Sequence, residues 1–444
     1  MHQMLPPGPN NSSLLQTVRW AFRPLPFMAE NRRRFGDSFS VKFLGFERPM
    51  VLISDPAAIK ALYMERAHGM PPGRNIILEP IVGSRSLLIQ EGAEHLSRRK
   101  LMLPPFHGER MRSYEGVVEQ IVSAEVDSWP LGREFPIHAR MQAVTLEVIL
   151  RAVFGVSQGP RLDRLRGMLE TVLQETAAPT RQLIGLATRR FGGGPWARFE
   201  GKLREVDELL FAEIREHRAR GGLEERGDIL SMLMLAEFED GGAIGDEELR
   251  DQLMTLLLAG HETTATALAW TFDLLLRHPV ELGRLRDSLA AADEEYLRAT
   301  ISESLRLRPV IPLAGRRLAT ELVVDGLTLP AGTDVAPAIW LTHTRDDLYP
   351  EPFAFRPERF LEGPPDTYGW IPFGGGIRRC IGASFAEFEM RIVLREVLTR
   401  CELRKASPAP EQTGRRNITL SPRAGTPVVV DARHPARERQ AVSV

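Results

Sequence analysis

Hydrophobic and polar positions follow helical spacing over most of the chain. Residues 111–155, 161–180 and 196–218 carry apolar residues three and four positions apart with charges between them, which predicts amphipathic helices. Before them, residues 38–45 and 49–53 are rich in β-branched and aromatic side chains in near alternation, which predicts a small hairpin. The pattern therefore favours a mostly helical protein with a minor β portion.

The longest helical pattern begins at Asp246 and runs to about Arg277. Its acidic first turn suits the positive end of a helix dipole, and Pro279 ends the pattern. The segment is apolar on nearly every face, so we expect it to be buried in the centre of the molecule. At about 32 residues and 1.5 Å per residue it would be about 48 Å long, enough to cross the domain.

Shorter elements follow this helix. A helix is expected over Glu294–Leu307, because Pro309 comes directly after it. Short strands are expected near Glu321–Val324 and Thr333–Ala336, separated by turn signals at Asp325-Gly326 and Pro330-Ala331-Gly332. Another helix is expected to start just after Cys380. Together these elements predict an α+β plan, helix-rich with small sheets.

Neither a linker nor a repeat with a period of 20–50 residues divides the 444-residue chain, which favours one large domain. We expect residues 1–30 to form an N-terminal extension, residues 31–432 the folded domain, and residues 433–444 a charged, disordered tail.

Charge and cysteine content narrow the function classes. Lys and Arg number 57 against 58 Asp and Glu, a formal net charge of -1, so nothing points to a nucleic-acid partner. The first thirty residues hold no long apolar run, and we expect neither a signal peptide nor a transmembrane anchor. A peripheral membrane contact stays open. Only Cys380 and Cys401 are present, which favours a reducing, cytoplasmic location over a disulfide scaffold.

The most informative stretch is residues 373–382, FGGGIRRCIG. Glycines on both sides of Cys380 let backbone N–H groups approach the sulfur, and such contacts favour a thiolate. A thiolate that ligates iron donates electron density and favours cleavage of an O–O bond. Phe373 beside the sulfur would limit water access. The structural alternative is a Gly-rich turn with an incidental buried cysteine.

A second unusual stretch, residues 259–264 (AGHETT), lies midway along the long apolar helix. Glycine, threonine and a carboxylate are poor choices there, and a buried carboxylate is costly unless it is paired or used. An acid beside an alcohol can relay protons, which makes Glu262 and Thr263 the candidate catalytic residues. The His-Glu-x-x-His pattern of zinc proteases is excluded because Ala265 replaces its second histidine. A structural role stays open for His261 and Thr264.

The cysteine loop resembles the haem-ligand loop of the cytochrome P450 family, Phe-x-x-Gly-x-x-x-Cys-x-Gly, at every fixed position. Three further motifs occur in the family's order, and the resemblance covers about residues 30 to 430. It implies the cytochrome P450 fold, with the long helix crossing a haem b whose iron is bound by Cys380. It also implies that Glu262 feeds protons and that Thr263 steadies the oxygen being reduced.

The resemblance further implies two sets of supporting residues. Glu303, Arg306 and Arg359 are expected to pair as a structural frame beside the cysteine loop. Arginines bind carboxylates bidentately and would hold the haem propionates; Arg316 competes with Arg317 for one such place. The predicted cofactor-binding residues are His95, Arg99, Ala259, Arg317, Phe373, Arg378, Cys380 and Gly382, with Cys380 also the metal ligand.

A lipophilic substrate is expected between the long helix and residues 68–90, 170–200, 309–315 and 415–421. The apolar members of these segments are Ile76, Ile77, Leu87, Leu88, Leu183, Ile184, Val310, Ile311, Leu313, Ile418 and Leu420. Three arginines could hold a carboxylate, namely Arg74, Arg85 and Arg181, although they could equally be surface charges. They favour a medium- or long-chain fatty acid; a terpenoid or steroid is the alternative.

No flavin or dinucleotide motif follows the cysteine loop, so electrons are expected from a separate ferredoxin or flavodoxin and its reductase, with O2 as co-substrate. Arg98, Lys100 and Arg379 could form a basic docking patch. Two other functions stay open. A peroxide-driven enzyme is disfavoured by the Glu262-Thr263 pair, and in a non-catalytic haem sensor or carrier that pair would serve no purpose.

Overall fold

The computed structural model describes residues 5–65, 69, 75–106, 108–155, 159–177, 194–239, 241–416 and 418–435. Several residues of the predicted substrate segments lie outside this part of the chain, as do residues 436–444 of the expected tail. They are Arg74, Arg181, Leu183 and Ile184, together with the side chains of Ile76 and Ile77.

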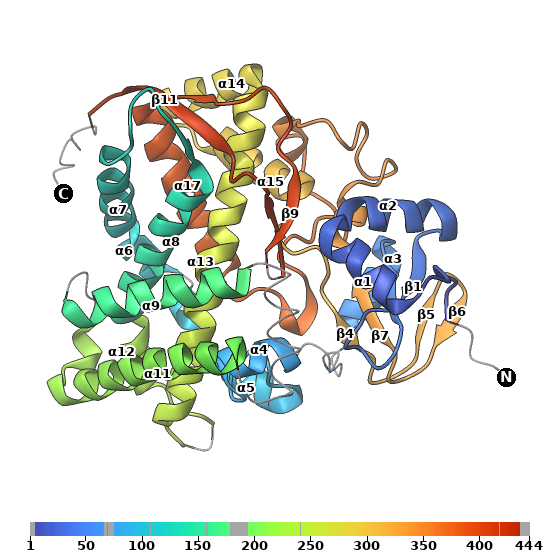
Figure 1. The fold of residues 1–444 in the computed structure, drawn as a ribbon, viewed down its shortest axis with the longest axis horizontal. Coiled ribbons are helices and arrows are strands. Elements are labelled where there is room, and N and C mark those ends of the chain that lie inside the picture. Colours follow the sequence, from blue (N-terminus) through green and yellow to red (C-terminus); the bar gives the residue numbers. More distant parts are fainter. Residues whose placement is uncertain are drawn as a thin grey trace.

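Helix α13 (Asp246–Arg277) has the predicted bounds and runs through the middle of the helical part of the molecule (Figure 1). From residue 248 to residue 275 its side chains are buried, except for Leu258, Ala259, Gly260 and Thr263. The accessible strip of this helix therefore coincides with the unusual motif found in the sequence.

Other helices cover α13 on several sides. Helix α8 (Ile137–Phe154) packs along it, and α11, α12, α15 and α17 also contact it. The helical pattern predicted over 111–155 is divided by strand β3 (Glu134–Pro136), because Pro130 and Gly132 interrupt it and a distant strand pairs there. The helices concerned are α6 (Glu109–Ser113), α7 (Glu115–Asp127), α9 (Pro160–Ala177), α11 (Pro195–Arg220), α12 (Ile229–Leu235), α14 (Pro279–Ala290), α15 (Glu295–Leu307) and α17 (Ala383–Arg400).

The predicted hairpin is confirmed. Strands β1 (Ser38–Val41) and β2 (Met50–Ile53) pair antiparallel, with Ser38 opposite Ile53. They belong to a four-stranded sheet of order β1-β2-β7-β4, in which β7 (Asp334–Pro337) lies between β2 and β4 (Arg316–Arg317). Figure 1 shows this sheet apart from the helical part, beside α1 (Ser13–Phe22), α2 (Pro24–Phe35) and α3 (Pro56–Met64). The domain boundary expected at residue 30 lies inside α2.

The two strands predicted near residues 321 and 333 belong to different sheets. Strand β5 (Leu322–Val324) pairs with β6 (Leu327–Leu329) across Asp325-Gly326. The C-terminal strands are β8 (Cys401–Lys405), β9 (Thr413–Arg416), β10 (Thr419–Pro422) and β11 (Pro427–Arg433); β9 pairs with β10, and β11 lies between β3 and β8. None of the described helices is long and apolar enough to cross a bilayer.

A buried ion cluster joins α11 to the N-terminal cap of α12. The fully buried His217 lies 3.2 Å from a Glu213 carboxylate oxygen and 3.7 Å from one of Asp228. Arg161 also pairs with Glu213, at 3.1 Å. Burial lowers the pKa of His217, but the hydrogen bond to Glu213 and the charges of Asp228 and Glu213 outweigh it and raise the pKa overall. Burial raises the pKa of Glu213, but bonds from His217 and Arg161 lower it overall.

This cluster should make stability depend on pH. A raised histidine pKa stabilises the fold below the ordinary value of 6.5, and that contribution is lost as the pH rises through the folded-state value. The lowered pKa of Glu213 stabilises the fold above pH 4.5, the ordinary pKa of a glutamate. This contribution is lost as the pH falls through the lowered value. We expect His217→Gln to reduce the free energy of unfolding by about 2 kcal/mol near pH 5.5. Urea unfolding should show this deficit shrinking towards pH 9; a deficit that does not change with pH would contradict the assignment.

Candidate active site

Cys380 follows the short helical turn η5 (Gly376–Arg378) and precedes α17. Its backbone N–H donates to the Phe373 carbonyl over 2.9 Å, which closes the loop. Burial raises the pKa of the Cys380 thiol, while the Gly382 backbone N–H, Arg379 and Arg99 act in the opposite direction. The side chain nevertheless has accessible surface. A cation bound at this accessible sulfur would favour the thiolate.

The glycines before Cys380 are needed for close packing as well as for turning. Gly374 and Gly376 have φ of 66° and 64°, which side chains other than glycine rarely adopt. A Cβ on Gly375 would lie 2.3 Å from the Tyr63 ring, and one on Gly376 would lie 2.9 Å from the Tyr63 carbonyl oxygen. Helix α3 therefore presses against the loop and fixes the position of the sulfur.

The accessible strip of α13 contains Ala259 and Thr263, one turn apart. The Thr263 hydroxyl donates to the Ala259 carbonyl over 2.7 Å, the kind of bond that withdraws a carbonyl from the helical ladder. Thr264, by contrast, is buried. The structure thus places Thr263, and not its neighbour, on the accessible strip of α13.

Glu262 lies beside Thr263 in sequence but points into a buried polar cluster. Its carboxylate accepts hydrogen bonds from Gln142 of α8 (2.7 Å) and from Arg416 of β9 (3.0 Å). Burial raises the pKa of Glu262, and Arg416 and Gln142 only partly offset this. The carboxyl therefore holds a proton at higher pH than an exposed one does. No pattern near Glu262 indicates either partner, because they lie 120 and 154 residues away along the chain.

Two buried histidines complete this cluster. The His138 ring nitrogen lies 3.2 Å from the Thr266 hydroxyl and 3.9 Å from the Glu262 carboxylate. His261 contacts the Thr145 hydroxyl at 3.0 Å. Burial lowers their pKa values to about 3 for His138 and about 4 for His261, so both rings are neutral near pH 7. His261 therefore has a structural contact and does not serve as a charged group.

Three arginines near Cys380 provide a test of whether the site fits a haem. Arg99, Arg316 and Arg378 form no ion pair within the described part of the chain, and the buried Nε atoms of Arg316 and Arg378 have no hydrogen-bond partner there. Burial, Arg316 and Arg99 all lower the pKa of Arg378, to about 10, despite the charge of Glu91. Such a cluster of like charges needs anions, and two propionates supply them. The residues present therefore fit a haem.

The contacts of Arg316 and Arg317 within the protein differ. The predicted residue, Arg317, makes a bidentate ion pair with Asp334 at 2.8 and 3.0 Å. Arg316 is 3% exposed, and its guanidinium lies 3.4 Å from the Gly375 carbonyl oxygen in the cysteine loop. Successive residues of strand β4 point to opposite faces. Arg316 therefore faces the cysteine loop, while Arg317 points the other way and pairs with Asp334. The geometry favours Arg316 over the predicted Arg317.

We expect Arg316→Gln to weaken haem retention about tenfold, because a charge-assisted hydrogen bond contributes about 1.5–3 kcal/mol. Arg317→Gln is the matched control and should leave retention unchanged. Transfer of haem to an excess of apomyoglobin, followed by absorbance, measures the rate of loss. Faster loss from the Arg317 variant than from the Arg316 variant would reverse the assignment.

The remaining predicted cofactor residues lie on two elements. His95, which is buried, and Arg99 are one turn apart on α5 (Gly92–Met102). Phe373 is half-buried, and its ring packs against Trp370 at 6.4 Å between centroids. Arg378 donates to the Gln90 carbonyl over 2.6 Å, which ties the cysteine loop to the segment before α5.

The predicted frame of Glu303, Arg306 and Arg359 is confirmed. Arg306 binds both carboxylate oxygens of Glu303, at 2.6 and 2.7 Å, and neither side chain has accessible surface. Arg359, in η4 (Pro357–Phe360), lies 3.4 Å from the same carboxylate. Arg306 also donates to carbonyls at positions 343, 352 and 354. This frame fixes the irregular chain that leads to the cysteine loop.

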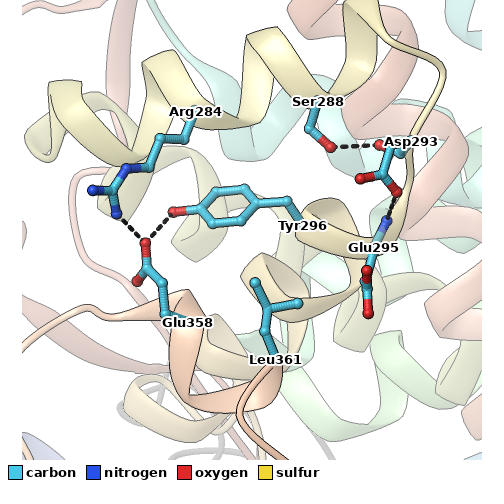
Figure 2. A pocket seen from close by; sticks show the side chains of 7 residues that line it. All are labelled: Arg284, Ser288, Asp293, Glu295, Tyr296, Glu358 and Leu361. Atoms are coloured by element: carbon cyan, nitrogen blue, oxygen red, sulfur yellow. Dashed lines mark hydrogen bonds and ion pairs between the residues drawn. The ribbon is translucent and has the colours of Figure 1, made fainter.

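One surface pocket lies apart from this site. It measures about 380 Å³ and lies between α14, the start of α15 and η4, where Figure 2 shows Arg284 and Tyr296 both directed at Glu358. Tyr296 donates to Glu358 over 3.0 Å, and Arg284 forms an ion pair with it. The pocket's central groups thus satisfy one another, so its role is to support η4.

Several predicted substrate and partner residues have other contacts. Arg85 pairs with Glu247 at 3.2 Å. Arg98 pairs with Glu248 at 2.7 Å, and Lys100 with Glu239 at 2.6 Å. Of the proposed basic patch, Arg379 alone is exposed without an ion pair in the described residues. Among the predicted apolar lining, Leu88, Ile311 and Leu313 are half-buried, Leu87, Val310 and Leu420 are buried, and Ile418 is 47% exposed.

Comparison with known proteins gives the same picture as the geometry. The model of the cytochrome P450 family matches residues 3–426. Cytochrome P450 135B1 of Mycobacterium tuberculosis is 40% identical over 435 residues, covering 96% of this chain and 92% of that protein. Cytochrome P450 137 of the same species is 38% identical, covering 89% and 83%. The retinoic-acid-bound cyanobacterial CYP120A1 has the same fold, with a TM-score of 0.82 at 24% identity over 96% of this chain and 99% of that one. With Cys380, the buried arginines and the acid–alcohol helix in place, the chain belongs to the cytochrome P450 family of haem-thiolate monooxygenases, which bind haem b.

Proposed function

We propose that this monooxygenase hydroxylates a lipophilic small molecule, with a medium- or long-chain fatty acid as the first choice. The supporting observation is that two of the expected substrate segments are anchored to α13 on either side of its accessible strip. Ser86 contacts Thr255 at 2.6 Å, less than one turn before Leu258. Leu420 accepts from Trp270 over 2.8 Å, about two turns after Thr263, and its own N–H donates to Val310.

These anchors supply an apolar wall. Leu88 follows the Ser86 anchor, and Ile311 follows Val310; both are half-buried, as are Leu258 and Phe373. Half-buried apolar side chains on the expected substrate segments suit a ligand of low polarity. Because Arg85 pairs with Glu247, the preference for a fatty acid over a terpenoid or steroid rests on Arg74 and Arg181, the other two candidate carboxylate partners, which lie outside the described residues.

When bound, the haem supplies the reduction of O2 and the transfer of one oxygen atom to a C–H bond. The protein's part is to exclude water and to move protons. We infer that the Glu262 carboxyl releases protons towards the Thr263 hydroxyl and regains them from solvent water on its Arg416 side, where the Arg416 side chain is 31% exposed. Hydrogen bonds from Gln142 and Arg416 hold the Glu262 carboxylate in place between one proton transfer and the next. Electron supply by a separate ferredoxin or flavodoxin, and a cytoplasmic location, stay predictions.

A binding screen tests the substrate class without requiring a redox partner. The purified haem protein is titrated with fatty acids of increasing length, with terpenoids, with steroids and with retinoic acid, the ligand of a structural neighbour. We expect saturable loss of the low-spin Soret band with long fatty acids, as the ligand displaces water. Tighter saturable binding of a steroid or terpenoid would favour the alternative, and no saturable response to any of these compounds would contradict a lipophilic substrate.

A further inference from the structure

Helix α1 carries apolar side chains on its solvent face, in addition to Trp20 and Ala21, which it buries. Its outward-facing side chains are apolar: Leu14 is 59% exposed, Leu15 46%, Val18 40% and Phe22 45%. At 100° per residue these four positions cover an arc of about 100° on the helix. The solvent face of a helix in a globular protein is normally polar, so this continuous apolar stripe needs an explanation.

Polar side chains of α1 point inward and fix the helix in place. The buried Gln16 donates to the carbonyls of Pro9 and Asn11 and accepts from the Lys42 N–H, at 3.2, 2.7 and 2.8 Å. The Thr17 hydroxyl accepts from the Leu44 N–H at 2.8 Å. Ser12 caps the first turn through the Leu15 N–H. The stripe is therefore presented by an anchored helix, and the exposed Leu44 extends it onto the chain after β1.

The surroundings of this stripe are basic. No Asp or Glu precedes Glu30, and residues 1–50 contain seven Lys and Arg against three Asp and Glu, a formal charge of +4 in a chain whose net charge is -1. Arg23 directly follows Phe22 at the end of α1, and Lys42 lies beside Gln16; both are exposed. Apolar side chains flanked by cations match the surface of an anionic bilayer, whose headgroups meet the cations while its acyl region accepts the apolar residues.

We propose that α1, with Leu44, Arg23 and Lys42, is an in-plane attachment surface for anionic membranes. The apolar stripe enters the headgroup boundary without crossing the bilayer, and the two cations lie at the lipid phosphates. This inference does not depend on the substrate class. It leaves the haem site and its residues on other elements unaffected.

Co-sedimentation with vesicles tests this proposal on the full-length haem protein. We expect binding to phosphatidylglycerol–phosphatidylcholine vesicles that weakens with salt, and much less binding to phosphatidylcholine alone. Leu15→Gln/Val18→Gln/Phe22→Gln should reduce the binding about tenfold or more, since glutamine keeps the helix but removes the apolar stripe. The matched control replaces three apolar residues of similar exposure elsewhere, Val280, Val323 and Leu361, with glutamine and should bind like the wild type.

Equal binding of the triple variant and the wild type, or no binding of the wild type to anionic vesicles, would overturn the proposal. Sedimentation velocity without lipid provides a second measurement. A dimer that the triple variant abolishes, together with no vesicle binding, would assign the stripe to self-association instead. Arg23→Gln/Lys42→Gln should lower the salt-sensitive part of binding while the protein keeps its unfolding midpoint.

Discussion

Replacing Glu262 with glutamine is expected to lower the rate of product formation about 100-fold, because a positioned proton donor contributes at least that factor. Glutamine keeps the size and can still accept from Arg416, and a turned Gln142 amide can accept from the new NH2 group, so the fold should be preserved. Reductant consumption should fall less than product formation. Product yield and reductant use are measured together under saturating substrate with a surrogate ferredoxin system.

The same substitution at Glu247 is the matched control. Glu247 lies in the first turn of the same helix, and its side chain is 76% exposed, so Glu247→Gln should retain the wild-type rate. Because burial raises the pKa of Glu262, the proton-donating form persists to higher pH than in an ordinary carboxyl. Its contribution is lost as the pH rises through that raised value. Wild-type rates and product yields in the Glu262 variant would contradict the relay.

Replacing Arg306 with alanine is expected to destabilise the folded protein by about 3–5 kcal/mol, because it leaves the carboxylate of Glu303 buried without its main partner. Both side chains have no accessible surface. The carbonyls at positions 343, 352 and 354 also lose their donor. The urea midpoint of the haem protein, followed by circular dichroism, should fall sharply, and haem should be released at lower urea.

Two further variants distinguish the frame from a simple charge effect. Arg306→Lys keeps the charge but cannot make the planar, multidentate contacts, so most of the loss should persist. Arg356→Ala removes an exposed partner of Glu362 nearby and should leave the urea midpoint close to that of the wild type. If the urea midpoint of the Arg306→Ala protein is close to that of the Arg356→Ala protein, the frame of Glu303, Arg306 and Arg359 contributes little to stability.

Local patterns were enough to place the elements that carry the site. The bounds of α13 were predictable because an acidic first turn and Pro279 mark its two ends. The start of α17 after Cys380 was predictable for a similar reason, since the loop glycines cannot extend a helix. The hairpin of β1 and β2 followed from residues close together in sequence.

Features that depend on distant pairing were not predictable from the sequence. Strand β3 interrupts the helical pattern because it pairs with β11, almost three hundred residues later. The same holds for Arg316 and Arg317, whose directions are set by the pairing of β4 with β7. Tyr63, against which Gly375 packs, and the two partners of Glu262 also come from remote segments. No pattern near any of these residues indicates the contact.

The central claim is that the sulfur of Cys380 binds the iron of a haem. The most direct measurement is the absorption spectrum of the reduced, carbon monoxide-bound protein. We predict the red-shifted Soret band that a thiolate opposite carbon monoxide produces, and its loss in Cys380→Ser but not in Cys401→Ser, which changes the other, buried cysteine. A wild-type spectrum without that band, or one that survives in Cys380→Ser, would contradict the account.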